Sequence, residues 1–199
     1  MDAQRQKQRI VSLLAVVMAL APAASADLTL IYTGSFDLRI PVEPQTGHAW
    51  MNDAVINVPE SFTVIDLDVE ITLEHTSVFD LQLFVRSPDA TALTLIYYDP
   101  ADEFFEGQNY TATIFDDEAD TPIESGHAPF TGRFTPRAPA ELTVFDGRDP
   151  QGPWTIRIYD SWYANVGALY EVKLIFQTPE PAAFLLLLLG IPLARPQKP

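Results

Sequence analysis

Residues 62–74 read FTVIDLDVEITLE, and from Ile65 onward apolar and polar side chains alternate without a break. A period of two residues is typical of a β-strand, because successive side chains of a strand point to opposite faces. One face of this strand is apolar, whereas the other carries four acidic side chains and a threonine. The stretch therefore predicts a strand that covers a core with one face and meets water with the other, as in an antiparallel sheet.

The acidic face of this strand is expected to be solvated. Its carboxylates have candidate partners in Arg86, Arg157 and Lys173, each of which lies on the polar face of its own predicted strand. Such cross-strand pairs between exposed side chains contribute a few tenths of a kcal/mol each.

Similar short alternations lie on both sides of this strand, separated by Gly, Pro, Asp and Asn. Before it, residues 27–42 indicate two strands with a turn at Gly34-Ser35. After it, strands or extended pieces are predicted at residues 80–87, 93–98, 109–115, 132–135, 142–145, 154–160 and 169–176. No segment of this region has a helical period, so the sequence predicts one all-β sandwich domain over residues 27–177.

The composition excludes several classes of protein. The chain has no Cys, which removes disulfides, thiolate metal sites and Cys nucleophiles. Its formal net charge is −15, and without residues 1–26 it has 12 − 3 = 9 bases against 27 − 1 = 26 acids, or −17. Such a surface repels nucleic acid and anionic membranes, and it attracts divalent cations or basic partners.

The N-terminus resembles a secretory signal. Basic residues up to Arg9 precede an apolar run from Ile10 to Leu20, and Ala24-Ser25-Ala26 fits an A-x-A cleavage site. We therefore predict a signal peptide at residues 1–26 and an exported mature chain that starts at Asp27.

Three adjacent carboxylates, Asp116, Asp117 and Glu118, directly follow the strand predicted at residues 109–115. One explanation is a bound hard cation such as calcium, which takes several carboxylate and carbonyl oxygens. The other is a solvated acidic turn. Asp160 poses a similar question, because it leaves its strand on the core side and therefore needs either loop amides or a cation.

No catalytic constellation stands out. His48, His75 and His127 are scattered, they lack zinc-ligand spacing, and no G-x-S-x-G motif is present. Two carboxylates suffice for glycoside hydrolysis, but nothing singles out two of the 26 acids. Several aromatic residues in predicted loops and at strand ends either form a platform for a sugar or peptide or cap the sandwich, namely Phe104, Phe105, Tyr159, Trp162 and Tyr163.

Several stretches, in order, resemble the P domain (P/Homo B domain) that follows the catalytic domain of subtilisin-like proprotein convertases and many bacterial serine proteases. The resemblance spans residues 56–176. It rests on His75-Thr76, Asp80-Leu81, Ser87-Pro88, Phe115-Asp116-Asp117-Glu118-Ala119, Pro129-Phe130-Thr131-Gly132, Phe134, Pro136, Leu142, Phe145, Gly147, Gly152, Trp154-Thr155, Asp160, Gly167, Leu169, Leu174 and Phe176.

The resemblance implies a jelly-roll β-sandwich, similar in outline to galactose-binding-like domains, with calcium in some members. It makes Asp80, Asp116, Asp117, Glu118 and Asp160 the candidate calcium ligands. The chain departs from the family at Val172, where a Trp is common, and at Asn165, where an Asp is common. The second departure removes a carboxylate from the candidate metal site.

The C-terminus resembles the PEP-CTERM tail of exported bacterial proteins, which a membrane transpeptidase of the exosortase class recognises. Pro179-Glu180-Pro181 opens the tail, an apolar run follows, and Arg195 and Lys198 end it. The apolar run is shorter than the roughly 20 residues that span a bilayer. The alternatives are a sorting tail at residues 178–199, a hydrophobic tail without that role, or a true membrane anchor.

These observations predict a non-catalytic, exported binding or structural module that is assisted by calcium and sorted to the cell envelope or extracellular matrix. In the convertases the P domain performs no chemistry, and the predicted strands leave no room for a protease domain. Expected partners are a protein or polysaccharide at the cell surface and an exosortase-type enzyme. The alternative is an accessory domain that stabilises or targets a separate subtilisin-like serine protease.

Overall fold

The computed structural model describes residues 27–41, 49–97, 107–162 and 164–180. The predicted signal peptide with Ala24 and Ala26, His48, the Phe104-Phe105 pair, Tyr163 and the tail from Pro181 onward lie outside these residues. Within the described part of the chain, no helix is long and apolar enough to cross a membrane.

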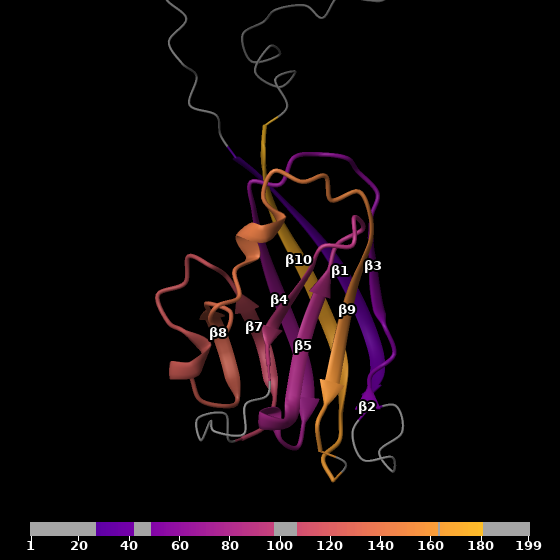
Figure 1. Ribbon diagram of the computed structural model, residues 1–199, viewed down its shortest axis with the longest axis vertical. Helices are drawn as coiled ribbons and strands as arrows, with labels where there is room; N and C mark the ends of the chain where they lie inside the picture. The colour runs from indigo at the N-terminus through magenta and orange to yellow at the C-terminus, as the bar shows by residue number, and fades with distance from the viewer. Residues whose placement is uncertain (1–26, 42–48, 98–106, 163, 181–199) are drawn as a thin grey trace, which may run out of the picture.

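Two five-stranded sheets face each other and run along the long axis of Figure 1. The first sheet has the order β1 (Asp27–Ile40), β10 (Gly167–Pro179), β4 (Asp66–His75), β7 (Tyr110–Phe115) and β8 (Phe130–Phe134). In the second sheet, β2 (Ala49–Trp50) and β3 (Ala54–Val58) both pair with β9 (Gly152–Asp160), followed by β5 (Leu81–Arg86) and β6 (Ala92–Ile96). Three short 3₁₀ helices lie in the connections: η1 (Val78–Asp80), η2 (Ile123–Ser125) and η3 (Leu142–Phe145).

The pairing is that of a jelly roll. Strands pair from the outside of the chain inward as β1 with β10, β3 with β9, β4 with β7, and β5 with β6, all antiparallel. A long hairpin that is rolled up so that alternate pairs fall into different sheets gives this order. The predicted all-β sandwich is confirmed. One pair departs from the expected antiparallel sheets, because β8 joins β7 in parallel.

Two local predictions were wrong. The first is the turn at Gly34-Ser35, because β1 continues through it as one strand of 14 residues that is interrupted only by a bulge after Ser35. The second is the strand predicted at residues 142–145, which is the 3₁₀ helix η3. A 3₁₀ helix brings residues i and i+3 to the same side, so η3 buries both Leu142 and Phe145.

β4 crosses the centre of the first sheet, and the alternation that predicts it is reproduced in its burial. Leu67, Val69, Ile71 and Leu73 are buried in the core between the sheets. On the other face, Glu70 accepts a hydrogen bond from Lys173 Nζ at 2.7 Å. Arg157, another predicted partner, instead pairs with Asp53. Asp68 is buried rather than solvated, which bears on the site described below.

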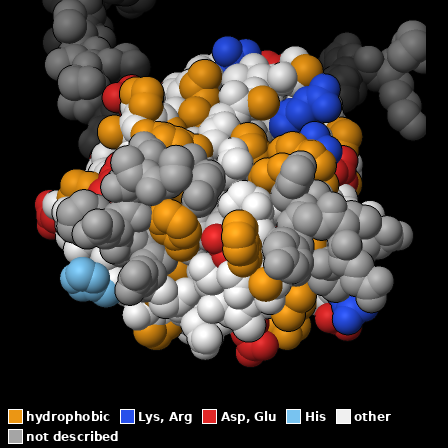
Figure 2. All heavy atoms as spheres, turned by 60° about the horizontal axis from the view of Figure 1, so that its bottom comes forward, with side chains coloured by type: hydrophobic (Ala, Val, Ile, Leu, Met, Phe, Trp, Pro, Cys, Tyr) orange, Lys and Arg blue, Asp and Glu red, His pale blue; other side chains and the backbone are white. Residues whose placement is uncertain are grey.

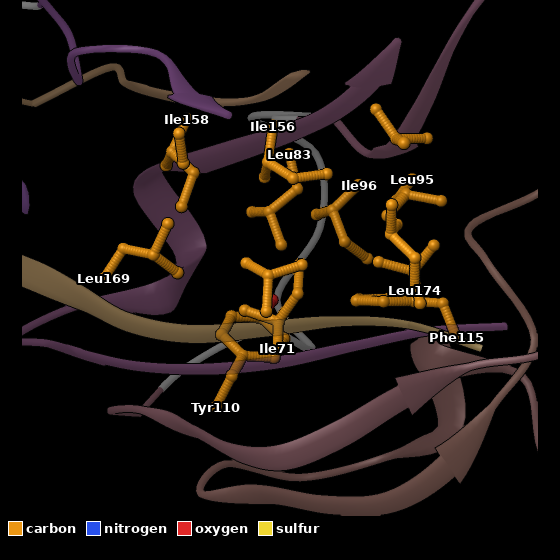
Figure 3. Packing of buried hydrophobic residues seen from close by; sticks show 14 of the residues in the cluster. Ile71, Leu83, Leu95, Ile96, Tyr110, Phe115, Ile156, Ile158, Leu169 and Leu174 are labelled. Carbon is orange, nitrogen blue, oxygen red and sulfur yellow. The ribbon is translucent and has the colours of Figure 1, made fainter. Parts of the chain in front are cut away.

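The core fills the space between the two sheets. Figure 3 shows Leu83, Ile156 and Ile158 of the second sheet above Ile71 and Leu174 of the first. Trp154 is central to one part of this core, because its ring contacts those of Phe145 and Phe176 with centroids 5.0 and 5.4 Å away.

Tyr110 lies in this core with its hydroxyl group buried and without a hydrogen-bond partner. A buried hydroxyl without a partner costs about 1–3 kcal/mol of stability. We therefore expect Tyr110→Phe to raise the free energy of unfolding by about 1 kcal/mol or more, as measured by urea denaturation. Tyr170→Phe is the control, because the Tyr170 hydroxyl lies at the surface and donates to Glu74. If Tyr110→Phe is no more stable than the parent, a water molecule satisfies the hydroxyl.

Candidate cation site

The five predicted calcium ligands divide between opposite ends of the sandwich. Asp116 follows Phe115, which lies opposite Val69 near the start of β4. Asp160 lies opposite Leu81, next to Asp80, and this end of the second sheet adjoins His75 at the end of β4. The structure thus brings Asp116, Asp117 and Glu118 together at one end, and Asp80 and Asp160 together at the other.

At the second end, Asp160 is surrounded by protein groups, but its Oδ2 makes no hydrogen bond. Its Oδ1 accepts from Trp162 N at 2.9 Å, and its Oδ2 lies 3.4 Å from His75 Nε2. Both side chains are fully buried. His75 Nδ1 lies 2.6 Å from the carbonyl oxygen of Ser77. Figure 2 looks onto this end, and among the coloured atoms of the described residues it shows hydrophobic side chains with acidic ones between them.

Asn165 explains how Asp80 is satisfied. Its Nδ2 donates to Asp80 Oδ2 at 2.5 Å, and its Oδ1 accepts from Thr76 Oγ1 at 3.0 Å. An aspartate at position 165 has no proton to donate to Asp80, so it would need a cation between the two carboxylates. The departure from the family pattern at Asn165 therefore replaces a charge by a hydrogen bond, and it makes this end the weaker candidate for a metal ion.

At the first end, the turn after β7 is built around Asp116. Its backbone N donates to Phe134 O, and its Oδ1 accepts from Glu118 N at 2.8 Å. This local bond from side chain to backbone is typical of Asp at the start of a turn. Asp117 Oδ2 accepts from Thr143 N at 2.8 Å and so ties the turn to η3.

Arg133 of β8 joins two buried carboxylates at this end. Its guanidinium donates to Asp116 Oδ2 and lies 2.8 Å from Asp68 Oδ2. The arginine side chain is half exposed, whereas those of Asp68 and Asp116 are buried. One cation therefore serves two carboxylates that are largely removed from water.

Burial, with the negative charge of neighbouring carboxylates second, raises the pKa values of several acids at this end. Burial, with the charge of Asp116 next, raises the pKa of Asp68 to about 6 despite the bond to Arg133. Burial is also the main cause of raised pKa values at Asp66, Glu118 and Asp146, and the charges of neighbouring carboxylates add to it. Each of these shifts means that a further positive charge at this end would be favourable.

These residues offer the oxygen donors that calcium takes. The donors are carboxylate oxygens, which calcium prefers, and two of them, Asp68 Oδ1 and Asp117 Oδ1, are buried without a hydrogen-bond partner. Asp117 and Glu118 also line a pocket of about 450 Å³ together with Glu141 and Thr143. In the described residues, however, no three acidic or His side chains are already gathered at metal-binding distances. The donor set fits calcium, and binding would require the side chains to close around the ion.

Sequence reasoning missed four residues of this end: Asp66, Asp68, Asp146 and Arg133. The sequence places Asp66 and Asp68 on the polar face of their strand, and strand alternation does not show which other parts of the chain cover that face. Arg133 lay in a predicted strand, but its nearness to the acidic triplet follows from the parallel pairing of β7 with β8. No local sequence signal marks that pairing.

A family model identifies the kind of domain. Residues 64–176, more than half of the chain, match the proprotein convertase P-domain family. Two solved structures are similar at 13% identity: the serine protease of Aeromonas sobria (TM-score 0.47, 80% of this chain and 28% of that one) and its complex with a chaperone (TM-score 0.48, 78% and 28%). The chain thus spans less than a third of the length of those proteins. No curated protein matches it.

Proposed function

Because this chain belongs to the proprotein convertase P-domain family, we propose that it is a non-catalytic, exported binding or structural module whose acidic end takes up calcium. The observation that carries the proposal is the family match itself, which covers the chain from just before β4 into β10. The family match supports the kind of module, whereas the calcium part of the proposal is argued from the residues of the site.

The surroundings of His75 support a non-catalytic role. The imidazole is fully buried and lies between the Ser77 carbonyl group and Asp160, which supports a structural role. A general base has to lie within hydrogen-bonding reach of the proton that it abstracts. His75 is therefore a structural residue that joins the end of β4 to the end of β9.

For calcium, the Asp116–Glu118 turn is the stronger candidate of the two ends. Asp117 has a free carboxylate oxygen and Glu118 lies beside it on the same pocket, with Asp66 and Asp146 close enough to feel their charges. A bound calcium ion would supply positive charge that relieves this repulsion. Asp117 would bind the ion and still accept the hydrogen bond from Thr143 N, which connects the turn to η3.

The predicted sorting route also stays part of the proposal. Asp27 lies opposite Pro179 in the β1–β10 ladder, and Figure 1 shows both described ends at the top of the sandwich. The two described ends of the chain, which continue in the sequence into the predicted cleavage site and the predicted tail, therefore lie at the same end of the domain. A module that is processed or anchored there would project its other end away from the envelope.

Thermal unfolding of the protein with calcium or with a chelator tests the calcium proposal. A ligand that binds only the folded state at a hundredfold excess over its Kd stabilises by about 2.7 kcal/mol, so the midpoint should rise by about 5 °C or more. Asp117→Asn should abolish the shift, whereas Asp53→Asn should keep it, because Asp53 is exposed and pairs with Arg157 far from the acidic end. An unchanged midpoint would show that the acidic end binds no calcium and would leave the family assignment intact.

The second candidate is an accessory role for a separate subtilisin-like serine protease, and the family tie to proprotein convertases favours it. Its test is the thermal half-life of a subtilisin-like protease that lacks its own P domain, with and without this protein. A longer half-life supports the accessory role. Peptide cleavage by this protein alone that is lost on a point substitution would contradict both candidates.

A further inference from the structure

β1 is an edge strand of the first sheet, and its only paired neighbour among the described residues is β10. A strand at an edge presents a row of unpaired backbone N–H and C=O groups, which is a template for another strand. With 14 residues, β1 is also the longest strand described in the protein.

Two of the other sheet edges make further backbone hydrogen bonds with the chain itself. Beside β6, Arg137 N donates to Leu95 O. Just past the end of β8, Thr135 exchanges backbone bonds with Thr121 and Ile123. The second half of β1 packs against β3, since a Cβ at Gly34 would lie 2.8 Å from the Ile56 side chain. The segment Asp27–Thr33, called the β1 edge below, is left open in the part of the chain that the structure describes.

The β1 edge lacks the side chains that usually prevent another strand from pairing with an edge. Asp27 is its only charged residue, and it contains no Lys and no Pro, the residues that usually block pairing at edges. Ile31 is 57% exposed, more than any other large hydrophobic side chain in the described residues, and Leu28 is 39% exposed. An open edge with exposed apolar side chains is a surface for strand addition.

The sequence of the β1 edge complements itself when two copies run antiparallel. A two-fold axis at Ile31 sets Ile31 opposite Ile31 of the second copy, and Thr29 opposite Thr33 of the second copy. Thr–Thr and β-branched pairs are favourable across strands, and Asp27 meets no like charge. In a parallel pairing Asp27 would face Asp27, which is unfavourable.

We propose that the β1 edge is an interaction surface that binds a second copy of this chain, antiparallel and centred on Ile31, so that the first sheets of two molecules form one continuous sheet. The interface is isologous, because each copy contributes the same residues.

Because the chain has no Cys, single-cysteine variants of the full chain report this geometry directly. Opposed residues of an antiparallel pair have Cα atoms about 4.5–5.5 Å apart, which suits a disulfide. Ile31→Cys should give a thiol-reversible covalent dimer under mild oxidation. Val55→Cys is the control, since Val55 on β3 is 50% exposed and lies outside the surface.

A second pair of variants fixes the direction of pairing. Thr29→Cys and Thr33→Cys should each form no covalent dimer alone and should cross-link only when mixed, because these positions face each other in the antiparallel arrangement. Cross-linking of each variant by itself would mean a parallel pairing and would overturn the proposal. Equal cross-linking of Ile31→Cys and Val55→Cys would mean non-specific association and would overturn it too.

Light scattering on the full chain gives an independent readout. The parent should have twice the 22.1 kDa mass of one chain, and Ile31→Lys, which sets two like charges opposite each other, should have the mass of one. The circular dichroism spectrum of Ile31→Lys should match that of the parent, because the substitution is at the surface. A monomeric parent, or a dimer that survives Ile31→Lys, would show that the β1 edge does not pair.

Discussion

Asp160→Ala should lower the free energy of unfolding by about 3 kcal/mol, because it removes a buried carboxylate that accepts a backbone hydrogen bond and lies beside a buried imidazole. The substitution removes the carboxylate that lies 3.4 Å from His75 Nε2, and it removes the Oδ1 acceptor for Trp162 N. Because both side chains are fully buried, water does not replace the lost partner. For a chain of this size the thermal midpoint should fall by about 10 °C.

Asp53→Ala is the matched control for this loss. Asp53 also pairs with a basic residue, Arg157, at 2.9 Å, but its side chain is 54% exposed. Exposed pairs contribute about 0–1 kcal/mol, so the control should shift the midpoint by no more than a few degrees. Equal effects of the two substitutions would show that the His75–Asp160 contact adds no stability beyond that of a surface pair.

Arg133→Gln should destabilise the protein by about 2–3 kcal/mol at pH 7.5, because it leaves Asp68 and Asp116 without their shared counter-ion. Arg157→Gln is the control. The two arginines are similarly exposed, at 50% and 42%, but the carboxylates of Arg133 are 6% and 7% exposed, whereas that of Arg157 is 54% exposed. Urea unfolding of both variants measures how much the burial of the partner matters.

The loss in Arg133→Gln should also depend on pH. The pKa of Asp68 is already raised from 3.8 to about 6 in the folded protein, so the folded state binds more protons than the unfolded state between these values. Stability from this group is therefore greatest at low pH and is lost as the pH rises through about 6. Without Arg133 the carboxylate is harder to ionise, so the variant should approach the parent in stability at pH 5. A difference between variant and parent that is the same at pH 5 and 7.5 would mean that Asp68 is not the affected group.

If the acidic end also binds calcium, saturating calcium should recover part of the stability that Arg133→Gln loses at pH 7.5. Removing the arginine leaves two more carboxylate oxygens free, and oxygen donors of this kind are the ones that calcium takes. The parent and the variant would then differ less in calcium than in chelator.

The sequence alone determined the fold class of this protein. Alternation at residues 65–74 and its shorter counterparts fix which side chains face the core, and a period of two leaves no other regular structure. The residue pattern predicted the boundaries and types of two short elements incorrectly. Where a turn was predicted at Gly34-Ser35, the strand continues with a bulge after Ser35. Where a strand was predicted at residues 142–145, the chain forms the 3₁₀ helix η3, which buries both Leu142 and Phe145.

Only the tertiary structure decided which acidic residues share a site. Asp116, Asp117 and Glu118 are adjacent in the chain, but their neighbours Asp66, Asp68 and Arg133 come from β4 and β8, whose positions depend on the rolled pairing of the whole sandwich. The same pairing sends Asp80 and Asp160 to the opposite end. A sequence records the types of side chains and their local period. The electrostatic energy of a carboxylate also depends on distance and burial, and both of these arise only when strands far apart in the chain come together.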